Sequence, residues 1–156
     1  MSTPDVAQIL AQLRASGRSL AVAESLTGGL LAATITGVAG ASDVFRGGIV
    51  AYATDLKQNL LDVPADLLAE FGPVHVEVAA AMAEGVRLRL GADLGLATTG
   101  VAGPDPQGGH APGLVYLAIA GPEGTITVRE LFSGDRSTIR ALTLGSALAL
   151  LSGYLA

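Results

Sequence analysis

Apolar residues recur along the chain with two spacings, one typical of helices and one typical of strands. Four of them, spaced three or four apart, predict an amphipathic helix near the N-terminus: Val6, Ile9, Leu10 and Leu13. Thr3 is expected to cap this helix, with Pro4 at its first position and Asp5 in its first turn. Gly17 is expected to end it.

After this helix, short apolar runs alternate with helical segments. Strands are predicted over residues 20–23, 47–53, 94–98, 114–120 and 125–132. Helices are predicted over residues 27–36, 54–61, 64–71 and 76–90, and from Asp135 to the C-terminus. Thr54 is expected to cap one of these helices, and residues 121–124 are expected to form the turn of a late hairpin. The alternation predicts a single three-layer α/β/α domain over residues 1–156, with a mixed, partly parallel sheet.

The composition narrows the class of protein. Half of the 156 residues are hydrophobic and only 15% are charged, so much of the chain must be buried. The formal net charge of −5 argues against nonspecific nucleic-acid binding, which needs a basic surface. Without cysteine the chain has neither disulfides nor thiolate metal sites.

The ends of the chain bear on its location. No basic segment leads into an apolar run at the N-terminus, so no secretory signal is visible and a cytoplasmic location is expected. Residues 141–156 are apolar but shorter than the roughly 18–20 residues of a membrane span. This segment is interpreted as a buried terminal helix or as one that packs against another subunit.

Polar, glycine-bearing turns follow three of the predicted strands, where ligands gather in open α/β sheets. They are Glu24–Gly29, Tyr52–Lys57 and Thr99–Pro104. Each has a purely structural explanation: a hydroxyl caps a helix, a glycine permits a turn, a lysine is solvated. Together, however, they supply a nucleophile, a base and hydrogen-bond donors.

Familiar catalytic sets are missing from the sequence. No serine, histidine and aspartate have convincing spacing, and His75 and His110 lie in turn-like contexts. Fingerprints of phosphate-binding and dinucleotide-binding loops are absent, as is metal-ligand spacing. A catalytic serine would therefore need another base, and lysine is the available candidate. A lysine acts as a base only where its site favours the neutral amine.

Four ordered blocks resemble the signatures of the CinA C-terminal domain family. They are AESLTGG at residues 23–29, GGIVAY at 47–52 with Lys57, TGVAGP at 99–104, and GDR at 134–136 with Arg140. The family includes nicotinamide-nucleotide amidohydrolases of the PncC type, which convert nicotinamide mononucleotide to nicotinate mononucleotide and ammonia. Some members carry a further N-terminal domain with pyrophosphatase activity. That activity is not expected here, because the chain begins at the C-terminal domain.

The resemblance implies roles for matched residues. Ser25 would be the nucleophile and Lys57 the general base, with Tyr52 and Thr99 as polar partners. The substrate contacts that it implies or suggests involve Glu24, Thr27, Gly28, Gly29, Gly100, Gly103, Arg136 and Arg140. A helix starting near Thr27 would offer free amides to an anion or oxyanion. No metal or cofactor is expected. The protein is expected to form dimers or larger homo-oligomers.

Some of these assignments have alternatives. Glu24 could bind a ribose hydroxyl, position Lys57, or be held by backbone amides at the turn. Arg136 and Arg140 could bind the substrate phosphate or simply pair with an acid such as Asp135. The resemblance implies a small nucleotide as the binding partner, and neither nucleic acid nor a membrane is expected.

The sequence also departs from the family pattern. Leu26 stands where the family commonly has cysteine, and Thr54, His75 and Val76 replace other polar residues. These departures leave room for a noncatalytic nucleotide-binding or regulatory domain, which would bind without turnover. A third alternative is a structural partner that assembles through its apolar C-terminal helix and responds to no ligand.

Overall fold

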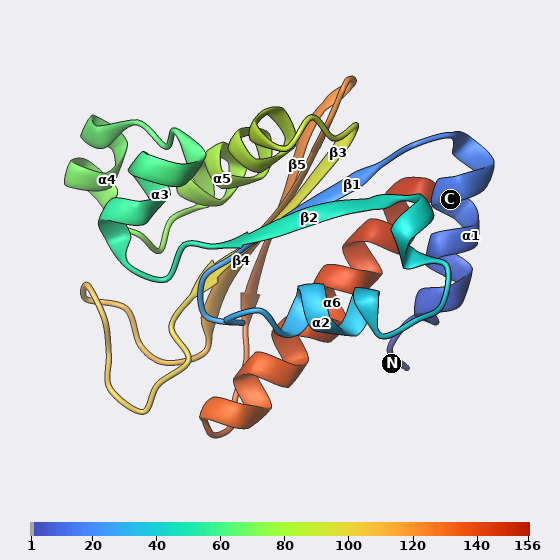
Figure 1. Cartoon of the computed structure of the whole chain (residues 1–156). Helices are drawn as coiled ribbons and strands as arrows, with labels where there is room; N and C mark the ends of the chain where they lie inside the picture. Colours follow the sequence, from blue (N-terminus) through green and yellow to red (C-terminus); the bar gives the residue numbers. More distant parts are fainter. Residues whose placement is uncertain (1) are drawn as a thin grey trace.

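The computed structural model describes residues 2–156, which form a five-stranded sheet between two layers of helices (Figure 1). The strands are β1 (Leu20–Glu24), β2 (Phe45–Val50), β3 (Leu94–Gly100), β4 (Leu114–Gly121) and β5 (Gly124–Leu131). Their order across the sheet is β2-β1-β3-β4-β5. β2, β1 and β3 are parallel, whereas β4 runs antiparallel to β3 and β5 runs antiparallel to β4. The predicted mixed, partly parallel sheet is therefore confirmed.

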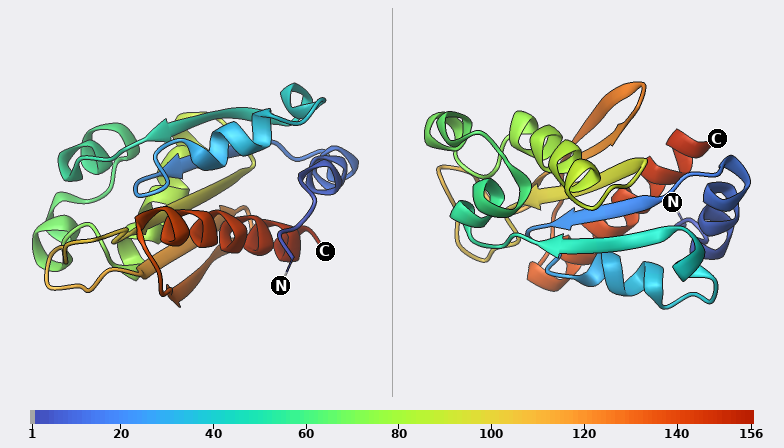
Figure 2. Two further views of the ribbon diagram at one scale, coloured as in Figure 1. Left: turned by 90° about the horizontal axis from the view of Figure 1, so that it is seen from below. Right: turned by 45° about the horizontal axis from the view of Figure 1, so that its top comes forward.

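Helices cover both faces of this sheet. They are α1 (Val6–Ser16), α2 (Leu30–Thr36), α3 (Thr54–Leu61), α4 (Ala65–Phe71), α5 (Val76–Arg89) and α6 (Arg136–Leu155), with a 3₁₀ turn at Ala41–Asp43. One core cluster joins α1, α2 and α6 to the sheet, and a second joins α3, α4 and α5 to the opposite face. In the right panel of Figure 2 the parallel strands all point to the end where α3, α4 and the loop before β4 gather.

The two faces of the sheet carry side chains of different size. Along β1, Leu20 and Val22 face α1, α2 and α6, whereas Ala21 and Ala23 face the α5 side. Small residues let α5 lie close against the strands. A Cβ added at Gly95 of β3 would lie only 2.0 Å from the Ala83 carbonyl oxygen of α5. The alanine and glycine positions therefore fix how deeply α5 packs.

The N-terminal helix starts later than expected. Asp5, not Thr3, is the cap, because its carboxylate accepts a hydrogen bond from the Ala7 N–H. Pro4 therefore lies before the helix rather than at its first position. Gly17 ends the helix in the left-handed conformation, as predicted, with φ 67°.

Three boundaries near the polar turns also differ from the prediction. β2 ends at Val50 rather than at residue 53, because its single neighbour β1 ends opposite it at Glu24. Thr54 is the first residue of α3 and makes no capping hydrogen bond; Ala53 occupies the cap position. α2 begins at Leu30 rather than at Thr27, because residues 26–29 form a turn.

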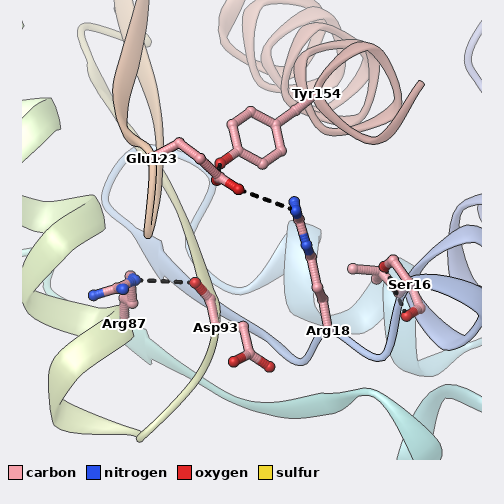
Figure 3. Close-up of polar contacts among 7 residues, drawn as sticks. Ser16, Arg18, Arg87, Asp93, Glu123 and Tyr154 are labelled. Carbon is pink, nitrogen blue, oxygen red and sulfur yellow. Dashed lines mark hydrogen bonds and ion pairs between the residues drawn. The ribbon is translucent and has the colours of Figure 1, made fainter.

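A polar cluster closes the opposite end of the sheet (Figure 3). Arg18, in the turn before β1, donates a hydrogen bond of 3.2 Å to Glu123 in the β4–β5 turn. The Tyr154 hydroxyl donates to the same carboxylate at 2.8 Å. Nearby, the Arg87 Nε donates to the Asp93 carbonyl at 2.9 Å. These contacts join α6, the hairpin and the strand starts.

Helix α6 is long and apolar. Over an 18-residue window its mean hydropathy is 1.3, so by length and composition alone it could cross a membrane. Core helices pass the same test, and α6 packs on the sheet through Ile139, Ala147, Leu148 and Leu151. The prediction of a buried terminal helix thus holds for this face of α6. Packing of α6 against a second subunit stays a prediction.

The close contact between α3 and α5 gives a test of the packing. A Cβ at Gly85 of α5 would lie 1.8 Å from the Leu61 carbonyl oxygen of α3. Gly85→Ala should therefore lower the free energy of unfolding by about 3 kcal/mol, measured by urea denaturation. The control is Gly153→Ala in α6, where a Cβ meets nothing within 4 Å. The free energy of unfolding of that variant should rise by up to about 1 kcal/mol. Equal stabilities of the two variants would contradict this account of the α5 packing.

Candidate active site

A cavity of about 400 Å³ opens at the carboxyl ends of β1 and β3. Seven of the residues expected in the site line it: Ser25, Tyr52, Lys57, Thr99, Gly100, Gly103 and Arg136. They come from all four blocks of the sequence. The reason is topological, because β1 lies between β2 and β3 and their carboxyl ends meet at one edge.

A hydrogen bond between side chains in this cavity joins Lys57 to Ser25. The Lys57 Nζ lies 2.9 Å from the Ser25 Oγ. The same nitrogen donates to the Ala51 carbonyl at 2.7 Å and lies 3.5 Å from the Tyr52 carbonyl. Two carbonyls can therefore take N–H donors while the nitrogen faces the serine hydroxyl.

Burial changes the acidity of this amino group. Lys57 is the single lysine of the chain, and only 1% of its surface is exposed. Removal from water disfavours the charged form and lowers the pKa of Lys57 from 10.5 to about 8. A considerable fraction of the side chain is thus neutral near pH 8, as a general base requires.

Local sequence explains why Lys57 points inward. Lys57 and Leu61 lie one helical turn apart in α3, and they are the two residues of α3 that are buried. Leu61 belongs to the core cluster on the α5 side of the sheet. The face of α3 that packs on the core therefore also carries the amino group.

Ser25 directly follows β1 and keeps the strand pairing. Its N–H donates to the Thr98 carbonyl of β3 at 3.0 Å, and the Ala51 N–H donates to the Glu24 carbonyl at 2.9 Å. The serine backbone is therefore held between the two neighbouring strands. Ser25 is 8% exposed and forms part of the cavity wall.

The expectation that Glu24 contacts substrate is corrected by its surroundings. Glu24 is 1% exposed, and its carboxylate accepts hydrogen bonds from the Leu31 and Ala32 N–H groups at 2.8 and 3.0 Å. The alternative that backbone amides hold this carboxylate is the one found. It also removes the expected anion site at the start of α2, because these amides of its first turn already bind Glu24.

Four further residues expected to bind substrate lie outside the cavity wall. Thr27 is fully buried, and its hydroxyl is 2.8 Å from that of Thr98. Gly28 and Gly29 adopt φ values of 55° and 101°, which the turn before α2 requires. Arg140 binds the carbonyls of Leu26 and Thr27. These residues build the turn behind Ser25, and none of the four lines the cavity.

The other polar residues of the site are held by defined partners. The Thr99 hydroxyl donates to the Pro73 carbonyl at 2.7 Å, which fixes the wall formed by Pro73 and Val74. At the mouth, the Arg136 guanidinium donates to the Tyr52 hydroxyl at 2.9 Å and to the Gly103 carbonyl at 2.7 Å. Tyr52 remains 59% exposed. Neither arginine pairs with Asp135 in residues 2–156.

Sequence reasoning missed part of the cavity wall. Leu26 and Val101, which line it, lie in two of the predicted polar turns, but sequence reasoning did not point to Val74, Asp105 and Gln107. The loop rich in glycine and proline after β3 was a usable sequence signal for Asp105 and Gln107. No sequence signal pointed to Val74, because the hydrogen bond from Thr99 to the neighbouring Pro73 brings it to the cavity. Within residues 2–156 no group of three or more histidine, aspartate or glutamate side chains is arranged to hold a metal ion.

Comparison with known proteins identifies relatives over nearly the whole chain. The model of the CinA C-terminal domain matches residues 3–155. A CinA-like protein of Frankia casuarinae is 53% identical over 148 residues, which cover 95% of this chain and 34% of the relative. The chain thus spans about a third of the length of the curated relatives it matches.

Solved structures of similar proteins have the same fold. The competence/damage inducible protein CihA of Agrobacterium tumefaciens is 33% identical, with a TM-score of 0.91 and 98% of each chain covered. A CinA superfamily protein of Klebsiella pneumoniae is 32% identical, with a TM-score of 0.93 over 99% of this chain and 98% of that one.

The surroundings of Glu24 predict a structural role that can be measured. Glu24→Gln replaces one acceptor oxygen with an amino group that would face a backbone N–H. The free energy of unfolding should fall by about 1–3 kcal/mol in urea denaturation. The control is Glu84→Gln. The Glu84 side chain is 45% exposed beside Arg87, so this change should alter the free energy of unfolding by less than about 1 kcal/mol. If Glu24→Gln kept its stability but lost activity, the result would favour a substrate contact of Glu24 instead.

Proposed function

This chain belongs to the CinA C-terminal domain family, and we propose that it is an amidohydrolase that releases ammonia from nicotinamide mononucleotide. The observation that carries the proposal is the contact of 2.9 Å between the Lys57 Nζ and the Ser25 Oγ in the cavity wall. A serine beside a partly neutral lysine is a nucleophile with its base.

The first step is activation of the serine. In the neutral amine the two N–H donors face the Ala51 and Tyr52 carbonyls, so the lone pair can accept the Ser25 hydroxyl proton. Ser25 then forms a bond to the carboxamide carbon, and the proton moves to Lys57. The resulting ammonium is stabilised by hydrogen bonds to the same two carbonyls.

The second step is departure of ammonia. The carbonyl oxygen of the substrate becomes an oxyanion, for which the N–H of Leu26, a residue of the cavity wall, is the proposed donor. Within residues 2–156 this N–H makes no hydrogen bond. Donors next to a nucleophile are common oxyanion sites. Lys57 returns its proton to the leaving nitrogen, the C–N bond breaks, and water hydrolyses the acyl-enzyme to nicotinate mononucleotide.

The cavity supports a small anionic substrate. Its volume of about 400 Å³ lies in the range of small-molecule sites. Arg136 stands at its mouth and lies in the first turn of α6, with its guanidinium beside the Tyr52 hydroxyl. A guanidinium at that position suits a phosphate group. We propose that Arg136 binds the phosphate and that Lys57 acts as the general base.

Ammonia release from nicotinamide mononucleotide is the direct test of the activity. The wild type should release ammonia, and Ser25→Ala should lose at least about a thousandfold in rate. Ser42→Ala, at an exposed position, is the matched control and should retain full activity. Equal release by wild type and Ser25→Ala would remove Ser25 from the mechanism. Binding of the nucleotide by folded wild type without any ammonia would favour the noncatalytic alternative.

The pKa of Lys57 predicts the pH dependence. A general base works in its neutral form, so kcat/KM should rise with pH and level off above about 8. Because the chain has a single lysine, protein labelled with ¹⁵N-lysine reports the titration of Lys57 directly by NMR. The two midpoints should agree.

Lys57→Arg separates the charge of this residue from its basicity. Arginine keeps a cation but holds its proton, so the rate should fall by about 100-fold or more. A variant with nearly full activity, or a Lys57 titration midpoint near 10.5, would contradict the role of base.

A further inference from the structure

The turn after the nucleophile is bound by an arginine that lies outside the cavity wall. The Arg140 Nε donates to the Leu26 carbonyl and its Nη2 to the Thr27 carbonyl, both at 3.0 Å. One guanidinium thus holds two successive carbonyls. An added Cβ at Gly28 would lie 3.7 Å from the same Nη2, so the guanidinium lies against this turn.

Holding these carbonyls also fixes amide directions. A peptide group is planar and trans, so its N–H points opposite to its carbonyl. The Thr27 carbonyl bound by Arg140 therefore sets the direction of the Gly28 N–H, which lies in the same peptide. The Gly28 N–H donates to the Ser25 carbonyl at 3.0 Å, which sets the direction of the Leu26 N–H. Arg140 thus steadies the Leu26 donor through one intervening hydrogen bond.

We propose that Arg140 is a positioning residue that acts through the Leu26–Thr27 backbone and does not bind substrate. The proposal rests on the proposed function, because it concerns the oxyanion donor of that reaction. A cation bound to the Thr27 carbonyl strengthens the Gly28 N–H as a donor to the Ser25 carbonyl. That hydrogen bond in turn polarises the peptide that carries the Leu26 N–H. The effect should therefore appear in the transition state, where charge develops on the oxygen, more than in substrate binding.

Glu24 binds backbone N–H groups next to the turn, as Arg140 binds the carbonyls within it. Its carboxylate holds the Leu31 and Ala32 N–H groups just after the turn, while the Arg140 guanidinium holds the carbonyls within it. The short segment behind Ser25 is thus anchored by one anion and one cation. Both side chains satisfy backbone groups at a place where irregular backbone is buried.

The experiment compares Arg140→Ala and Arg140→Lys with wild type in ammonia release from nicotinamide mononucleotide. For Arg140→Ala, kcat should fall by about 10–100-fold, while KM stays within about threefold. Added guanidinium chloride at low millimolar concentration should restore part of kcat. Arg140→Lys should lie between the two, since an ammonium lacks the planar fork that holds both carbonyls.

Arg14→Ala is the matched control. Arg14 also donates to a backbone carbonyl, that of Gly40 at 3.3 Å, and pairs with Asp43 away from the cavity. Its removal should leave kcat unchanged and should show no response to guanidinium. A large rise in KM for Arg140→Ala at unchanged kcat would mean that Arg140 binds substrate, and unchanged kcat and KM would mean that it has no role. Either result overturns the proposal.

A second readout keeps the inference testable if the substrate is different. Should wild type release no ammonia, the proteins are treated with a fluorophosphonate, from which Ser25 displaces fluoride to form a phosphonyl ester. The phosphoryl oxygen also needs the Leu26 amide, so Arg140→Ala should react about tenfold more slowly than wild type and Arg14→Ala. Equal rates would overturn the role of Arg140. If Arg140→Ala fails to fold, Arg140→Lys takes its place in both experiments. Thermal unfolding then checks that Arg140→Lys is folded.

Discussion

The Lys57 amino group lies beside the Ser25 hydroxyl at 2.9 Å, in a position that is almost closed to water. A buried ammonium is costly unless it is well hydrogen-bonded. The protein balances these effects, because burial lowers the pKa to about 8 while the Ala51 carbonyl gives the nitrogen a partner at 2.7 Å. The amine can thus hold or release a proton near pH 8, as the proposed role of general base requires.

This position depends on packing some distance from the cavity. The alanine and glycine face of the sheet allows α5 to lie close, and Gly85 brings α5 against the end of α3 at Leu61. Leu61 is one turn beyond Lys57, so the depth of α5 sets where the amino group lies. Ser25 is fixed independently, through its N–H bond to Thr98 of β3. The two groups meet because core packing positions α3 and strand pairing positions Ser25.

The last helix supplies two arginines with different surroundings. Arg136 and Arg140 are four residues apart, on one side of α6. The first reaches the cavity mouth at Tyr52 and Gly103, whereas the second holds the turn behind Ser25. One helix face thus contacts both the cavity mouth and the backbone behind Ser25. Both sets of contacts depend on where α6 lies against the sheet.

The sequence alone determined the kinds of elements, the mixed sheet and the chemistry available at the strand ends, because these follow from apolar spacing and from residue type. It also identified Ser25 and Lys57 as candidates, and only the tertiary structure decided that they lie within hydrogen-bond distance. The sequence does not determine strand order, which brings the turns together, or the partners of buried charges. Glu24 and Arg140 look like substrate ligands in the sequence, yet backbone groups bind them. A charged side chain is bound by whichever complementary group the fold places nearest, and spacing along the chain does not encode that distance.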